Sequence, residues 1–465
     1  MRLTALLLLA AASSAWAADR APNIVFILAD DLGRAELGCY GQKKIRTPEI
    51  DRLAAEGMRF KRFYAGSPVC APSRCVLLTG RHNGRAAVRD NREAKPEGQF
   101  PLPAAEVTVA ERLKARGYAT ACIGKWGLGM VGTEGDPNTQ GFDLFYGYNC
   151  QRHAHNHYPT YIRRNAERIP LEGNPGGPTG KQHTHDLMEA EALKFVRDHK
   201  DRPFFLYLPF AIPHVAIQVP DDSLAEYKGK WDDPAYTGGK GYLPHPAPRA
   251  GYAAMVTRMD RSVGRLTALL KELDLDGNTV VFFSSDNGPT HNVGGADSDF
   301  FESAGGLRGL KGSVFEGGLA TPMIVRWPGR VKPESVSDWT GAFCDVLPTL
   351  CDIAGAEVPA ADTDGISFLP TLLGRDGQKR HEFLYWEFPG YGGQQAVRLG
   401  DWKGVRTGMG KGNTRIALYD LTKDPAESDD VAARHPDVVA RIAKIMAGQH
   451  VPSKAFPIKV LDGGM

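Results

Sequence analysis

The sequence carries almost no net charge. It has 56 Lys and Arg residues against 54 Asp and Glu residues, so its formal net charge is +2 at pH 7. A chain so close to neutrality has no overall field that would draw it to nucleic acid or to a membrane surface. We therefore expect no nucleic-acid partner, and we expect any selectivity for a charged ligand to come from a local cluster of side chains.

Long apolar runs are scarce as well. One run, residues 3–12, follows Arg2 and precedes the small-x-small pattern Ala15-Trp16-Ala17. It is too short to span a bilayer, and its flanks are those of a secretory signal peptide. We therefore predict a signal peptide over residues 1–17, export to the periplasm or the extracellular space, and no membrane span in the mature protein.

Cysteine is sparse. The 465 residues include seven cysteines, which are Cys39, Cys70, Cys75, Cys122, Cys150, Cys344 and Cys351. Such a low density favours buried free thiols over a disulfide framework. An odd number nevertheless leaves one thiol over if the others pair, so the disulfide pairing stays open at this point.

Several segments are apolar along their whole length. Residues 23–28 read Asn-Ile-Val-Phe-Ile-Leu, without the polar alternation of a strand that faces water on one side. Such a run is typical of a strand buried on both faces of a parallel sheet. Other strands are predicted at 118–123, 204–208, 279–283 and 322–326, and helices at 47–57, 108–117, 186–199, 251–273 and 345–353. Strands that alternate with helices predict an α/β fold with a large, mostly parallel sheet sandwiched by helices.

The pattern changes after about residue 374. Short strands are predicted at 383–387, 395–399, 402–406 and 416–419, separated by glycine-rich turns, and a helix is predicted at 435–447. Short strands joined by such turns favour an antiparallel sheet. We predict a large domain over residues 18–375 that carries the functional site, and a smaller C-terminal subdomain, an antiparallel sheet plus helix, over residues 376–465.

Polar side chains follow two of the predicted buried strands. Asp30 and Asp31 come directly after the first strand, and Asp286 and Asn287 follow the strand at 279–283 closely. The carboxyl ends of parallel strands form the ligand crevice of an open sheet, so these four side chains are expected to meet. Their ligand atoms are all oxygens, a set that suits Ca²⁺ or Mg²⁺ better than zinc. Either pair alone would be read as turn and cap residues, but both pairs together favour a metal site.

The stretch Ser67-Pro-Val-Cys-Ala-Pro-Ser-Arg-Cys places a cysteine close to a predicted helix. Pro72 fits the first position of a helix, so Cys70 would lie at or just before the N-terminus, where backbone N–H groups favour anions. Arg74 adds a guanidinium that can hold an oxyanion. The pattern favours a nucleophilic thiolate, and the alternative is a buried structural cysteine beside a salt-bridged arginine.

The same stretch carries a family signature. Cys70-Ala71-Pro72-Ser73-Arg74 matches the C-x-P-S-R motif of type I, formylglycine-dependent sulfatases, and the following Leu-Leu-Thr-Gly-Arg matches the usual continuation of that motif. Further family motifs follow in the family's order at Asp30-Asp31, Gly124-Lys125-Trp126, Pro213-His214, Asp286-Asn287 and residues 309–318. The chain therefore resembles the arylsulfatase-like members of the alkaline phosphatase superfamily over nearly its whole length.

This resemblance implies a site and a cofactor. Cys70 would be oxidised to Cα-formylglycine by a formylglycine-generating or anaerobic sulfatase-maturating enzyme. One Ca²⁺ would be held by Asp30, Asp31, the modified Cys70, Asp286 and Asn287. Arg74, Lys125 and Lys311 would bind sulfate oxygens, and His214 would serve the leaving group. His155 and His291 are weaker candidates for substrate binding, and the alternating histidines 153, 155 and 157 are read as an ordered loop over the pocket rather than as a metal tract.

One departure from the family pattern affects the mechanism. Many sulfatases read G-K-W-H-L-G, and their histidine is assigned to the elimination step, but here Gly127 stands at that position. Asp286 or His291 are candidates to act in its place.

The substrate expected from these features is a sulfated carbohydrate, with sulfated galactose or N-acetylgalactosamine units as one class. Export and the His-, Tyr- and Arg-rich segment 151–164 favour a sugar over a small phenol. Two alternatives stay open: a phosphonate or phosphodiester hydrolase of the same superfamily, and a glycan-binding protein whose Cys70 is unmodified.

Overall fold

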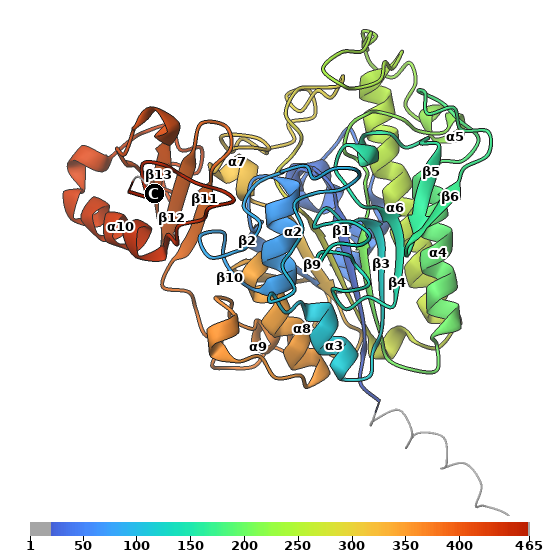
Figure 1. Ribbon diagram of the computed structural model, residues 1–465, viewed down its shortest axis with the longest axis horizontal. Coiled ribbons are helices and arrows are strands. Elements are labelled where there is room, and N and C mark those ends of the chain that lie inside the picture. The colour runs from blue at the N-terminus through green and yellow to red at the C-terminus, as the bar shows by residue number, and fades with distance from the viewer. Residues whose placement is uncertain (1–19, 464–465) are drawn as a thin grey trace, which may run out of the picture.

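The computed structural model describes residues 20–463, and the predicted signal peptide lies outside them. A ten-stranded sheet has the order β10-β2-β9-β8-β1-β7-β3-β4-β5-β6, with helices on both faces, and a separate four-stranded sheet has the order β11-β12-β13-β14 (Figure 1). This arrangement confirms the predicted α/β sandwich with a smaller antiparallel sheet.

The centre of the large sheet is parallel. Strand β1 (Asn23–Ala29) pairs in parallel with β7 (Phe204–Pro209) on one side and with β8 (Thr279–Ser285) on the other. Strand β3 (Ala119–Lys125) runs parallel to β7 and to β4 (Leu144–Tyr148). Because these strands share one direction, the residues that follow them lie along one edge of the sheet.

The two flanks of the large sheet contain antiparallel strands. Strand β9 (Met323–Arg326) lies antiparallel between β8 and β2 (Met58–Tyr64), and β10 (Ser335–Ala342) pairs in parallel with β2. On the far flank β5 (Tyr161–Arg164) and β6 (Glu167–Pro170) form a hairpin. Of these flanking strands, only β9 was predicted from the sequence.

Each face of the sheet has its own apolar core. Alternate residues of β1 belong to different cores, with Ile24 and Phe26 on one face and Val25 and Ile27 on the other. This double burial explains why β1 lacks polar alternation. The first core includes α2 (Cys70–Thr79), α3 (Val109–Ala115) and α8 (Val346–Ala354), and the second includes α1 (Pro48–Ala55), α4 (Thr184–Asp198) and α6 (Pro248–Glu272). Shorter helices are α5 (Asp221–Leu224), α7 (Glu316–Leu319) and α9 (Leu369–Leu372).

Helix α2 begins two residues earlier than its proline predicts. Its first residue is Cys70, so Pro72 occupies the third helical position rather than the first. Proline is tolerated there because the N–H groups of the first turn have no partner within the helix. Gly80, with φ of +72°, ends the helix in the left-handed conformation. The consequence is that Cys70 lies within the first turn, where the free N–H groups are.

The C-terminal sheet stands beside the large domain (Figure 1). It consists of β11 (Leu384–Phe388), β12 (Gln394–Leu399), β13 (Trp402–Thr407) and β14 (Ala417–Asp420), all antiparallel. Helix α10 (Pro436–Gln449) packs on it through Ile442 and Met446, which belong to a third apolar core. The predicted domain boundary at residues 375–376 falls between α9 and β11, and it stays a prediction.

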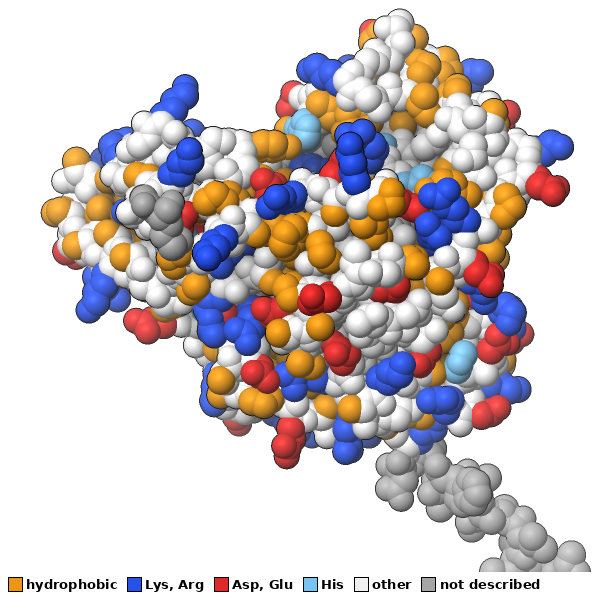
Figure 2. Space-filling view, viewed as in Figure 1, with side chains coloured by type: hydrophobic (Ala, Val, Ile, Leu, Met, Phe, Trp, Pro, Cys, Tyr) orange, Lys and Arg blue, Asp and Glu red, His pale blue; other side chains and the backbone are white. Residues whose placement is uncertain are grey.

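Within the described residues, the structure bears on three sequence-based expectations, which concern a membrane span, disulfide bonds and the distribution of charge. No helix among residues 20–463 is long and apolar enough to cross a membrane. All seven cysteines are free thiols, so the disulfide pairing that the sequence left open is not formed. On the face in Figure 2, basic and acidic side chains are interspersed rather than gathered by sign.

Candidate active site

The polar residues that follow β1 and β8 lie against one another. The N–H of Asp31 donates to Asp286 Oδ1 at 3.2 Å, and Asn287 Nδ2 donates to Asp31 Oδ1 at 2.8 Å. Asp30, Asp31, Asp286 and Asn287 are fully buried. Asp31 has φ of +64°, a left-handed conformation that Asp adopts more readily than most residues. The structure thus brings together the four side chains that the sequence placed at two strand ends.

Cys70 faces these carboxylates from the N-terminus of α2. Its Sγ lies 3.4 Å from Asp30 Oδ1 and 3.9 Å from Asp31 Oδ1. Burial, together with the charge of Asp30, raises the pKa of the Cys70 thiol far above its usual range. In this environment an unmodified Cys70 is a protonated thiol, which is a weak nucleophile. The thiolate interpretation of the motif therefore loses support.

Three buried cations balance the three carboxylates. Arg74 donates to Asp286 Oδ2 from Nη2 at 2.7 Å and from Nε at 3.1 Å. Lys125 Nζ lies 2.5 Å from Asp30 Oδ2. Lys311 Nζ lies 2.8 Å from Asp31 Oδ2. We call these three cations and the three carboxylates the catalytic cluster.

The pKa values of the carboxylates reflect this balance. Burial opposes the ionisation of Asp30, but Lys125 and Arg74 outweigh it and hold its pKa below the usual value. Burial and the charge of Asp30 raise the pKa of Asp286 to about 6 in spite of Arg74. Neighbouring carboxylates disfavour one another's ionisation, so the cations are needed if all three carboxylates are to be ionised together.

His214 adjoins the same point. Its Nε2 lies 3.0 Å from Lys311 Nζ and 3.4 Å from Asp31 Oδ2. Burial and the charge of Lys311 lower its pKa well below the usual value, so the ring is neutral without an anionic ligand. The ring of His155 stacks on that of His214, with centroids 4.8 Å apart and planes 15° apart. His155 therefore lies beside the catalytic cluster.

The other histidines have different surroundings. His291 is partly exposed, its Nδ1 has no hydrogen-bond partner, and burial and Lys311 lower its pKa. His157 Nε2 lies 3.0 Å from the backbone oxygen of His214, so it supports the loop that carries that residue. His153 and His155 form the ends of a short 3₁₀ turn. This conformation agrees with an ordered loop.

The donor set fits a hard divalent cation. Asp30, Asp31 and Asp286 present carboxylate oxygens, and Asn287 Oδ1 is buried without a hydrogen-bond partner. The ligand atoms of Asp30 and Asp31 lie within 4.8 Å of those of Cys70 and His214. Oxygen-rich sets of this kind suit Ca²⁺. The residues present therefore fit the ion that the resemblance implies.

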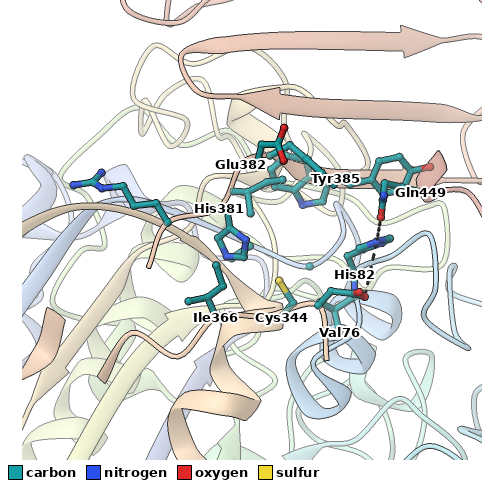
Figure 3. A pocket seen from close by; sticks show the side chains of 15 residues that line it. Val76, His82, Cys344, Ile366, His381, Glu382, Tyr385 and Gln449 are labelled. Carbon is teal, nitrogen blue, oxygen red and sulfur yellow. Dashed lines mark hydrogen bonds and ion pairs between the residues drawn. The ribbon is translucent and has the colours of Figure 1, made fainter. Parts of the chain in front are cut away.

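A second group of metal-type side chains lies elsewhere. Figure 3 shows a pocket of about 190 Å³ between α2 and the C-terminal sheet, lined in part by His82, Cys344 and His381. Cys344, Asp345 and His381 have ligand atoms within 4.8 Å of one another. Asp345 already accepts hydrogen bonds from two backbone N–H groups, and its Oδ1 lies 2.8 Å from His381 Nε2. This group is therefore a satisfied hydrogen-bond network, and no residue of the catalytic cluster lines the pocket.

Sequence reasoning missed the residue beside Gly127. Gly127 has φ of +81°, and the position that a Cβ would take lies 2.6 Å from Gln151 Nε2 and 3.9 Å from Arg74 Cδ. The amide of Gln151 thus fills the space next to the glycine, and both its polar atoms are buried without partners. Gln151 follows β4 at the same edge of the sheet as Lys125. A polar residue shortly after a predicted buried strand is the sequence signal that could have identified Gln151. It joins Asp286 and His291 as a group to test where the usual histidine is absent.

Family models match both parts of the chain. One described as Sulfatase matches residues 22–356, and one described as N-sulphoglucosamine sulphohydrolase, C-terminal, matches residues 310–450. Arylsulfatase A of Homo sapiens is 34% identical over 94% of this chain and 89% of its own length. The N-acetylgalactosamine-6-O-sulfatase of Bacteroides thetaiotaomicron is 30% identical over 91% of this chain and 92% of its own.

The fold is also similar to solved structures. A crystal structure of Ps i-CgsB in complex with k-i-k-neocarrahexaose has a TM-score of 0.79 and 27% sequence identity, and the match covers 93% of this chain and 94% of that one. The similarity therefore includes the C-terminal sheet as well as the large domain.

Proposed function

This chain belongs to the sulfatase family and is a sulfuric-ester hydrolase, and we propose that its substrate is a sulfated carbohydrate, with sulfated galactose or N-acetylgalactosamine units as the first class to test. One observation carries the proposal. Arg74 and Lys125, both fully buried, and Lys311, whose side chain is 7% exposed, lie around Cys70 at the N-terminus of a helix. A sulfate ester presents negative oxygens around sulfur, and fixed cations stabilise the charge that develops during its cleavage.

The site is proposed to contain two cofactors, a modified Cys70 and a calcium ion bound at the strand ends. We propose that a formylglycine-generating or anaerobic sulfatase-maturating enzyme oxidises Cys70 to formylglycine, and that Asp30, Asp31, Cys70, Asp286 and Asn287 hold one Ca²⁺. The hydrated aldehyde would supply the nucleophilic hydroxyl and the second hydroxyl that releases sulfate, and the cation would supply positive charge that stabilises the sulfate. Export to the periplasm or the extracellular space, by the signal over residues 1–17, belongs to the same proposal.

Side chains of this protein bind the sulfate ester and supply the proton for the leaving alcohol. We assign Arg74 and Lys125 to the sulfate oxygens, and Lys311 both to the sulfate and to the leaving oxygen. His214 Nε2, next to Lys311 Nζ at 3.0 Å, is the atom placed to give a proton to the departing alcohol. The negative charge of a bound ester favours the protonated ring, which offsets the influence of the two lysines on its pKa.

The choice of a sugar rests on relatives and on the site. The relative from B. thetaiotaomicron is an N-acetylgalactosamine-6-O-sulfatase, and the Ps i-CgsB structure holds a neocarrahexaose. Partly exposed His155 and His291, beside the cluster, are polar groups suited to contact a sugar.

The test is a panel of substrates. Purified protein, produced with a maturation enzyme and calcium, is assayed on regiodefined sulfated monosaccharides, an aryl sulfate, an aryl phosphodiester and an aryl phosphonate. Turnover of a sulfated sugar well above the phosphorus esters is the expected result. Preference for a phosphorus ester would favour the phosphonate or phosphodiester hydrolase, and glycan binding without turnover by protein with an intact Cys70 thiol would favour a binding protein.

A further inference from the structure

The turn between β11 and β12 carries an exposed aromatic side chain. Tyr391 is 66% exposed, and it is the only aromatic residue classed as exposed within residues 20–463. A single exposed apolar side chain is not unusual by itself. Whether Tyr391 has a role in binding is therefore decided by its backbone conformation and its neighbours.

The backbone holds Tyr391 in an unfavourable conformation. Its φ is +50°, in the left-handed region that bulky residues rarely adopt. Gly390 precedes it and Gly392 and Gly393 follow it, so the neighbouring residues would accept that conformation more readily. The ring of Phe388 meets the Tyr391 ring edge-on, with centroids 5.5 Å apart. Backbone strain retained at a packed, outward-pointing ring is typical of a binding site.

Tyr391 adjoins the catalytic cluster. Its ring atoms lie 2.0 and 2.4 Å from the position that a Cβ on Gly312 would take, so the ring packs directly on the residue after Lys311. Gln394 Nε2 donates to the oxygen of Gly312 at 2.7 Å, which ties the β11–β12 hairpin to the loop of Lys311. The C-terminal sheet thus places an aromatic ring one residue from a predicted sulfate-binding lysine.

A second tyrosine adjoins the cluster through its histidines. The ring of Tyr242 lies 5.2 Å from that of His155, which in turn stacks on His214. Tyr242 is half-buried. Burial raises the pKa of Tyr242, so its phenol is protonated at neutral pH. Figure 2 shows the outline of the molecule indented between the C-terminal domain and the upper loops of the large domain.

We propose that Tyr391 and Tyr242 bind the sugar ring that bears the sulfate ester. Sugar rings have C–H faces and hydroxyl edges, and a tyrosine offers an apolar ring and a polar hydroxyl to match them. The catalytic cluster recognises the sulfate, which every substrate shares, and the tyrosine pair recognises the alcohol that carries it. This inference rests on the proposed sulfated-carbohydrate substrate, and it makes the C-terminal subdomain a part of substrate recognition.

The experiment separates sugar binding from sulfate binding. Wild type, Tyr391→Ala, Tyr391→Phe and Tyr391→Asn are assayed for kcat and KM on the sulfated sugar that wild type turns over best, and for inhibition by inorganic sulfate. Asn tolerates a positive φ, so Tyr391→Asn removes the ring without adding strain. Val336→Ala, at an exposed residue of β10, is the matched control.

We expect Tyr391→Ala and Tyr391→Asn to raise KM for the sugar by about three- to tenfold, the effect of losing one aromatic contact. Tyr391→Phe should raise KM by less than the two ring-less variants do, because it keeps the ring and loses only the hydroxyl. The inhibition constant for inorganic sulfate should be unchanged in every variant. An unchanged KM in both ring-less variants would overturn the tyrosine site while leaving the proposed function intact. Absence of sugar turnover by wild type that hydrolyses aryl sulfate would overturn the substrate class and this inference together.

Discussion

Two of the buried charge clusters within residues 20–463 differ in what they adjoin. The catalytic cluster combines three carboxylates and three cations around Cys70 at the carboxyl edge of the large sheet. The second, which we call the interdomain cluster, combines Glu316 and Glu427 with Lys403 and Arg398. Both are almost entirely out of water. Burial of charge therefore does not by itself distinguish a functional site from a structural one.

The interdomain cluster joins the C-terminal sheet to the large domain. Lys403 Nζ, from β13, lies 2.7 Å from Glu316 Oε1, at the start of α7. Tyr64, from β2, donates to Glu316 Oε2 at 2.7 Å, and the N–H of Glu316 donates to Glu427 Oε2 at 2.6 Å. Burial opposes the ionisation of Glu316, but Lys403 and Arg398 hold its pKa below the usual value. These contacts connect two sheets and surround no nucleophile.

One sequence motif serves both clusters. Lys311 and Glu316 are five residues apart in the segment 309–318, yet Lys311 pairs with Asp31 and Glu316 pairs with Lys403. A residue's place in a family motif therefore does not reveal whether it acts on substrate or holds domains together. The contrast between these clusters predicts which substitutions remove activity and which remove stability.

The largest expected effect is on turnover in Cys70→Ala. Loss of a covalent nucleophile removes on the order of 10⁵-fold or more of the rate. The substitution removes only one buried sulfur atom, so the thermal unfolding midpoint should change by only a few degrees. Cys75→Ala, another fully buried cysteine of α2, is the control and should keep its turnover. Substantial hydrolysis by purified Cys70→Ala would show that the catalytic cluster works without this side chain.

The next largest effect is a loss of folding stability in Lys403→Met. Removing the cation leaves Glu316 and Glu427 buried without it, and breaking a buried pair in this way costs about 3–5 kcal/mol of unfolding free energy. Urea unfolding measures the loss, and kcat of the folded fraction should stay near the wild-type value.

The control for this variant is Lys423→Met. Lys423 pairs with Asp420 at 3.0 Å but is 83% exposed, so its loss should change the unfolding free energy by less than about 1 kcal/mol. Equal stability losses in the two variants would remove the distinction between a buried interdomain cluster and ordinary surface ion pairs.

A smaller effect is expected for His214→Ala, and it should depend on the leaving group. Assistance by a general acid matters most for a basic sugar hydroxyl and least for an acidic nitrophenol, so sugar turnover should fall by about a hundredfold and aryl sulfate turnover by much less. Lys311→Ala should impair both substrates because the lysine also binds sulfate. Equal losses for the two substrates in His214→Ala would leave the histidine as a binding residue only.

The smallest effect is a pH dependence of stability in the C-terminal region. The hydrogen bond to Glu387 raises the pKa of His450, which also contacts Asp462. Because the pKa of His450 is higher in the folded protein than in the unfolded chain, its protonated ring stabilises the folded state. This stabilisation is fully present below the unfolded-state pKa of about 6.5, and it is lost as the pH rises through the folded-state pKa. The stability difference between wild type and His450→Gln should therefore shrink from pH 5.5 to pH 8. A difference that does not vary with pH would mean that His450 contributes through packing alone.

The sequence predicted most of the fold where local patterns decide it. The strand at residues 23–28 and the helix predicted at 108–117 depend on local patterns, and both are found close to their predicted positions. Thr108 caps that helix by accepting from the N–H of Glu111. Asp30 and Asp286 could be placed together because parallel strands end at one edge. The start of α2 was wrong by two residues, since proline is tolerated throughout the first turn.

Features that depend on distant packing were not predictable. The sequence of residues 322–326 does not indicate that β9 is antiparallel, because the direction of the strand depends on its pairing with β8 and β2. Gln151 meets Gly127, and Tyr391 meets Gly312, only after the chain has folded. Lys403 and Glu427 likewise have no sequence motif that would pair them with Glu316.

The chemical state of Cys70 in active protein tests the central claim most directly. Mass spectrometry of the peptide that contains Cys70 measures the fraction converted to an aldehyde in preparations made with and without a maturation enzyme, and turnover of an aryl sulfate is measured on the same samples. We predict that turnover rises in proportion to the converted fraction and is absent from protein that holds only the thiol. Full turnover by protein whose Cys70 is entirely unmodified would contradict the account.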